Sequence, residues 1–213
     1  MTSSAEGLEI TIIQSMGNHI IMQVHTIIQT HGRTRHNTVR TLLVFILILR
    51  GGSMIPIAHY LYEISFSGYY QKKDWQNWAD QRILKQTIAE EWLNDISLAN
   101  SIEMLSNALG DLLISERFEV KNRTPSSDAI IGYYYLMYLE GKFSLQELLL
   151  KSGDEADGGE GASVECEEFY AISSQLEKDI FLMEDTDFHR KISVLYEPFG
   201  KIAQQQMEEL EMY

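Results

Sequence analysis

Apolar residues recur at intervals of three and four through most of the chain after Met54. This interval places side chains on one face of an α-helix. The clearest such series contains Ile102, Leu105, Ala108, Leu109, Leu112 and Leu113. Similar series lie in residues 57–64, 130–138, 169–180 and 188–210. The pattern predicts a mainly α-helical protein whose amphipathic helices close into a compact multi-helix bundle.

Residues that favour helix ends lie between these series. Asp74 and Ser101 are suited to cap the first turn of a helix, and residues 144–147 match a capping box. Gly141 can close the helix before it, because glycine adopts the left-handed conformation without strain. Pro198 lacks an amide hydrogen, so we expect it to kink or restart the last helix. The residues between 152 and 165 are expected to form the longest loop.

The first fifty residues have a different pattern. β-Branched residues alternate loosely between Leu8 and Gln29, which is typical of strands, and Gly17-Asn18 offers a turn between them. The apolar run Leu42–Leu49 is far shorter than the roughly 20 residues that cross a bilayer. We therefore expect no membrane segment and an N-terminal extension, residues 1–53, that is either β-structured or disordered.

Met54 offers an alternative start for the protein. The peptide Arg50-Gly51-Gly52-Ser53-Met54 is what a purine-rich ribosome-binding sequence would encode if it were read in frame. Under this hypothesis residues 1–53 are not part of the evolved fold, and residues 54–213 form the whole acidic helical domain. Mass spectrometry of the native N-terminus would decide between the two starts.

The charge of the chain changes at the same place. Residues 1–53 hold four arginines against two glutamates, whereas residues 54–213 hold 13 basic and 29 acidic residues, a net charge of −16. Such a surface repels the phosphates of nucleic acids. It favours encounter with a protein that has a basic surface, since complementary charge speeds association.

The densest acidic segment is Gly153–Glu168, between two expected helices. Aligned as a calcium-binding EF-hand loop from Asp154, it has Ala156 and Gly158 where two ligands are required, so calcium binding is not expected. The segment is then either a solvated flexible loop or a loop that contacts a partner. Its candidate contact residues are Asp154, Glu155, Asp157, Glu160, Glu165, Glu167 and Glu168.

Three consecutive tyrosines cannot all face the interior of a helix. Of Tyr133, Tyr134 and Tyr135, we expect Tyr135 to lie at the surface, where it would anchor the same partner. The single cysteine, Cys166, excludes a disulfide within the chain and a zinc site built from cysteine pairs.

Recognisable catalytic motifs are absent from the sequence. It contains no phosphate-binding loop, no dinucleotide-binding glycine motif and no zinc-protease helix motif. After Met54 only His59 and His189 are histidines, and neither has a recognisable partner in the sequence. We expect no catalytic residues, no bound metal and no cofactor.

These observations favour a non-catalytic, cytoplasmic binding protein whose acidic surface blocks a basic protein partner. Bacterial immunity proteins and antitoxins that neutralise toxins share this size and charge, which is an analogy of type. One alternative is a helical metal-dependent hydrolase that uses clustered carboxylates. Another is a structural or regulatory subunit with an apolar interface. The sequence does not indicate an oligomeric state.

Overall fold

The computed structural model describes residues 6–16, 19–30, 33–38, 55–120, 124–159 and 161–213. It divides into two compact units, Met1–Met54 and Ile55–Tyr213. The expected turn at Gly17-Asn18, the apolar run Leu42–Leu49 and the candidate contact residue Glu160 lie outside the described residues.

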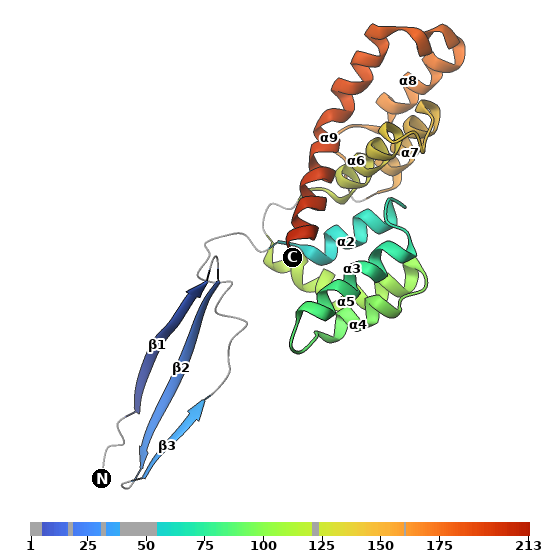
Figure 1. Ribbon diagram of the computed structural model, residues 1–213. Helices are drawn as coiled ribbons and strands as arrows, with labels where there is room; N and C mark the ends of the chain where they lie inside the picture. Colours follow the sequence, from blue (N-terminus) through green and yellow to red (C-terminus); the bar gives the residue numbers. More distant parts are fainter. Residues whose placement is uncertain (1–5, 17–18, 31–32, 39–54, 121–123, 160) are drawn as a thin grey trace. The chain divides into compact units, whose positions relative to one another are not determined.

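The first unit contains a three-stranded antiparallel sheet in the order β1-β2-β3 (Figure 1). Its strands are β1 Glu6–Met16, β2 His19–Thr30 and β3 Arg33–Thr38. β1 pairs with β2 from Glu6 opposite Ile28 to Met16 opposite His19, with one irregularity between Ile12 and Gln14. The β-branched residues of this segment thus lie on strands, as their loose alternation predicts.

The second unit is the expected helical bundle, and Figure 1 shows α9 extending along α6. Its elements are α2 Ile57–Phe66, α3 Lys72–Lys85, α4 Glu91–Leu98, α5 Ile102–Glu119, α6 Ser126–Leu139, α7 Leu145–Gly158, α8 Cys166–Lys178, the 3₁₀ turn η1 Ile180–Glu184, and α9 Thr186–Met212. The prediction of a mainly α protein is confirmed. No helix among the described residues is long and apolar enough to cross a membrane.

Two apolar clusters hold the bundle together. The first joins α2, α3, α4 and α5 around residues such as Leu61, Leu93 and Leu105, and α9 contributes Leu210. The second joins α6, α7, α8 and α9 around Ile131, Leu148 and Phe169. Helices α6 and α9 contribute to both clusters, so these two helices connect the halves of the bundle.

Several expected helix ends are confirmed. The Ser101 side chain accepts a hydrogen bond from the Met104 amide, and Ser144 and Glu147 form the predicted capping box. Gly141 has a φ of 73° immediately after α6, the left-handed conformation that favours glycine.

Other local expectations were wrong in detail. Asp74 is the third residue of α3 and forms a capping box with Gln71, which is the actual N-cap. Ile102 and Ile180 are exposed instead of buried. Pro198 lies inside a continuous α9 and does not restart the helix. Packing of α9 against α6 accounts for that continuity, because tertiary contacts outweigh a local loss of one hydrogen bond.

Candidate functional site

More of the acidic segment is helical than the sequence predicted. α7 continues through Asp154, Glu155 and Asp157 to Gly158, so the loop predicted over 152–165 begins only after that residue. Gly153 explains this continuation, since a β-carbon there would lie 2.5 Å from Cε1 of Tyr170. Close packing of α7 on α8 thus keeps a glycine-rich segment helical against its low intrinsic propensity.

The junction of α7 and α8 brings part of the predicted set together. The Tyr170 hydroxyl donates a hydrogen bond to Oδ1 of Asp154 at 2.8 Å. The Cys166 Sγ lies 3.3 Å from Oε2 of Glu167 and 3.8 Å from Oδ1 of Asp157. We call Asp154, Asp157, Cys166, Glu167 and Tyr170 the acidic seam.

Negative charge in the acidic seam affects its two titratable neighbours. The hydrogen bond to Asp154 raises the pKa of Tyr170 to about 12. The hydrogen bond to Glu167 likewise raises the pKa of the Cys166 thiol. Both protons are held more tightly because ionisation would add negative charge beside existing carboxylates. Cys166 is therefore a poor nucleophile in this environment.

The remaining predicted residues lie elsewhere. Glu165 is the N-cap position of α8 and is exposed. Glu168 lines a separate groove of about 370 Å³ with Arg190 and Lys191 of α9. Glu155 faces a third region, where its Oε1 accepts a hydrogen bond from the Ser127 hydroxyl at 2.9 Å.

Tyr135 packs within the bundle. It is partly buried, and its ring stacks on Tyr196 of α9 with centroids 5.3 Å apart. A β-carbon at Gly200 would lie 2.9 Å from Cδ1 of Tyr135. These contacts give Tyr135 a packing role between α6 and α9.

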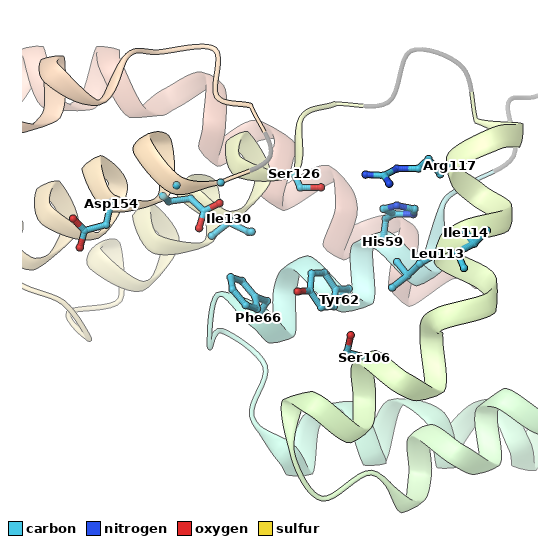
Figure 2. Close-up of a pocket in the computed structure, with 13 residues that line it drawn as sticks. His59, Tyr62, Phe66, Ser106, Leu113, Ile114, Arg117, Ser126, Ile130 and Asp154 are labelled. Carbon is cyan, nitrogen blue, oxygen red and sulfur yellow. The ribbon is translucent and has the colours of Figure 1, made fainter.

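The structure also contains a site that the sequence analysis missed. A pocket of about 620 Å³ lies between α2, α5, α6 and the end of α7 (Figure 2). It is lined by His59, Tyr62, Phe66, Ser106, Leu113, Ile114, Arg117, Ser126, Ile130, Asp154, Glu155, Gly158 and Gly159. This volume falls within the range of about 300–1,000 Å³ that is typical of ligand pockets.

Glu116 of α5 holds His59, which lines one side of this pocket, through hydrogen bonds. Its Oε1 accepts the Ala58 amide at 2.9 Å, and its Oε2 accepts the His59 amide at 3.0 Å. The same Oε2 lies 2.7 Å from Nδ1 of the His59 ring. Pro56, the N-cap residue of α2, supplies no side-chain cap, so Glu116 satisfies these amides from another helix.

The Glu116 carboxyl group is buried, and burial raises its pKa to about 7, although the bond from Ala58 acts in the opposite direction. Among the described residues, Nε2 of His59 has no hydrogen-bond partner, while the ring lines the pocket. The contact between the Glu116 carboxyl group and Nδ1 orients the His59 ring and leaves Nε2 accessible to a ligand. His59 therefore does have a companion, 57 residues away in the sequence.

The opposite wall of the pocket is anionic. Burial raises the pKa of Glu155, while the Ser127 hydroxyl bond lowers it. Gly159 closes this wall, because a β-carbon there would lie 2.1 Å from Oγ of Ser127 and 2.3 Å from Oε1 of Glu155. In Figure 2, Asp154 lies on the side of the pocket away from His59 and Arg117.

Within the described residues, no group of three or more His, Cys, Asp or Glu side chains could hold a metal ion. Comparisons with protein-family models, curated proteins and solved structures found no significant match.

Proposed function

We propose that the chain is a non-catalytic, cytoplasmic binding protein of the immunity or antitoxin type, which neutralises a partner with a basic surface. Its helical domain would present carboxylates to that partner instead of using them for chemistry. The acidic seam and the neighbouring Glu165 are the proposed contact surface.

The exposure of unpaired carboxylates carries this proposal. Asp154, Asp157, Glu165 and Glu167 are exposed, and none of them forms an ion pair with a lysine or arginine among the described residues. Three of these side chains gather around Tyr170 and Cys166. Unpaired surface charges of one sign attract a partner of the opposite sign over distances of about 10 Å in moderate salt.

The first experiment identifies the partner. Affinity purification of the tagged full-length chain from its natural host, at low and at high salt, should recover a protein with a basic surface only at low salt. Binding of the purified pair is then measured by isothermal titration at several salt concentrations. An interaction that does not weaken with salt would contradict a charge-driven contact.

A matched pair of triple variants locates the contact. The seam variant carries Asp157→Asn, Glu165→Gln and Glu167→Gln, and the control variant carries Asp95→Asn, Glu103→Gln and Asp111→Asn on α4 and α5. Both remove three exposed negative charges. The seam variant should slow association with the partner by about tenfold or more, and the control should change it far less.

An apolar patch favours one second candidate, a regulatory subunit that binds through hydrophobic contact. Ile180 and Phe181, neighbours in η1, are 74% and 78% exposed. Exposed apolar side chains that lie close together often mark interfaces. Under this alternative, Phe181→Ser would abolish binding and the seam variant would not.

A further inference from the structure

The pocket between α2, α5, α6 and α7 combines features that suit one kind of side chain. Asp154 and Glu155 of α7 line one side of it; the Glu155 carboxyl group accepts the Ser127 hydroxyl bond there, whereas the Asp154 carboxyl group points away and accepts the Tyr170 hydroxyl bond. The other lining is largely apolar or aromatic and includes Tyr62 and Phe66, whose rings stack with centroids 5.4 Å apart. A cation on a flexible apolar stem matches both parts of this lining, because the stem packs on apolar surface while its head group meets the Glu155 carboxylate.

Two buried polar groups in the pocket lack partners. Ser126 is 8% exposed and lines the pocket, and none of the described residues forms a hydrogen bond with its hydroxyl. His59 is 7% exposed, and its Nε2 is likewise without a partner among the described residues. Neither atom is among the fully buried side-chain atoms that lack a partner, so both are accessible from the pocket and can bond to an occupant.

The rim of the pocket is open to a macromolecule. Phe66 and Ile114 both line the pocket and are 49% and 61% exposed. Phe66 ends α2 and Ile114 lies on α5, so the apolar rim spans two helices. Exposed apolar side chains around a pocket are typical of a site that receives an anchoring side chain from a protein partner.

We propose that this pocket receives an arginine side chain of the basic partner, with its guanidinium group against Glu155 and its stem over Tyr62 and Phe66. This inference rests on the proposed function, because it takes its occupant from the expected basic surface. Arginine fits better than lysine, since its planar head group offers five donors and can form two parallel hydrogen bonds with one carboxylate.

The opposite end of the pocket contains His59 and Arg117 (Figure 2), away from Asp154. Arg117 carries a positive charge, so a second cation is more favourably placed at the Glu155 end. The charges that line the pocket therefore set the end at which the guanidinium group lies.

Titration of the full-length chain with N-acetyl-arginine-N-methylamide, followed by two-dimensional NMR, tests this inference. The matching citrulline compound is the control probe, because it has nearly the same shape but no charge. We expect the arginine probe to shift the resonances of Phe66, Ser127 and Glu155, and the citrulline probe to shift them at least about fivefold less at equal concentration. Equal shifts with both probes, or no shifts with the arginine probe, would overturn the proposal.

A second test of the proposal compares two variants that each remove one negative charge. Glu155→Gln retains an oxygen that can accept the Ser127 hydroxyl bond, and Asp95→Asn removes an exposed carboxylate of α4 that lies outside the pocket and the acidic seam. We expect Glu155→Gln to weaken binding of the arginine probe about tenfold and Asp95→Asn to leave it nearly unchanged. Equal weakening by both variants would show a nonspecific charge effect and would also overturn the proposal.

The same variants separate the failure of this inference from the failure of the proposed function. If the partner binds with salt dependence and Glu155→Gln leaves its affinity intact, the pocket proposal is wrong and the acidic-surface proposal stands. If no basic partner exists but the arginine probe binds in the pocket, the proposed function is wrong and the guanidinium site stands.

Discussion

Glu116 organises the start of α2 through three hydrogen bonds with residues that lie far from it in the sequence. It accepts two backbone amides and contacts the His59 ring, and all of these groups are buried. The usual cap of a helix is a side chain at the N-cap position, but Pro56 has no group that could serve. A single carboxyl group thus determines both the helix end and the orientation of a pocket histidine.

Replacement of Glu116 by alanine should therefore be costly. Glu116→Ala leaves the Ala58 and His59 amides without their acceptor in a buried environment, so we expect the free energy of unfolding to fall by about 1–3 kcal/mol. Urea denaturation followed by circular dichroism measures the change. Glu119→Ala on the same helix is the control, because its exposed side chain should alter stability by no more than about 0.5 kcal/mol. Equal effects of the two substitutions would contradict the role assigned to Glu116.

The raised pKa of Glu116 predicts a pH dependence of stability. Its pKa rises from 4.5 to about 7 on folding, so between these values the folded protein holds a proton that the unfolded chain has released. This contribution to stability is full below about pH 4.5 and is lost as the pH rises through about 7. We expect the free energy of unfolding to decline between about pH 5 and pH 8 more steeply in the wild type than in Glu116→Gln. Parallel or reversed slopes in urea denaturation would refute this assignment.

The candidate pocket could not be predicted from the sequence for a simple reason. His59 and Glu116 belong to different helices, and no periodic pattern relates residues 57 positions apart. Glu155 was identified only as a member of an acidic run, although its contact with Ser127 sets it apart from Asp154 and Asp157. Such contacts depend on how helices pack, and helix packing leaves little trace in local sequence patterns.

At the scale of elements, helix boundaries were the most predictable feature. Ser101, Ser144 and Gly141 act where the sequence placed them, because capping is a local interaction between residues a few positions apart. The end of α7 was the main error. Its glycines favour a loop locally, but Gly153 instead permits close contact with Tyr170 of α8.

The contact between α6 and α9 depends on a glycine in the same way. A β-carbon at Gly132 would lie 2.1 Å from the backbone oxygen of Phe199, which cannot rotate aside. We expect Gly132→Ala to lower the free energy of unfolding by about 1–3 kcal/mol or more, because the two helices must separate. Thermal unfolding followed by circular dichroism provides the measurement.

Gly110→Ala on α5 is the matched control for this prediction. Nothing lies within 4 Å of a β-carbon at Gly110, so alanine should raise stability by up to about 1 kcal/mol through its higher helix propensity. If both substitutions stabilise the protein, α6 and α9 are not packed as closely as described.

At the scale of the whole molecule, the helical unit contains its own apolar clusters. The described members of both clusters lie between Ile57 and Leu210. We therefore expect a chain that begins at Met54 to fold by itself, with the helical circular dichroism spectrum and the unfolding midpoint of the full-length helical unit. A truncated chain that lacks a cooperative thermal transition would show that residues 1–53 are required for folding.

The way in which α2 begins has a consequence for the order of folding. An isolated peptide of residues 55–67 would lack the acceptor for its Ala58 and His59 amides, since that acceptor comes from residue 116. The first turn of α2 should therefore form only after α5 has docked, late in the folding reaction. Hydrogen exchange at Ala58 and His59 would then report opening of the α2–α5 contact and not simple fraying of a helix end.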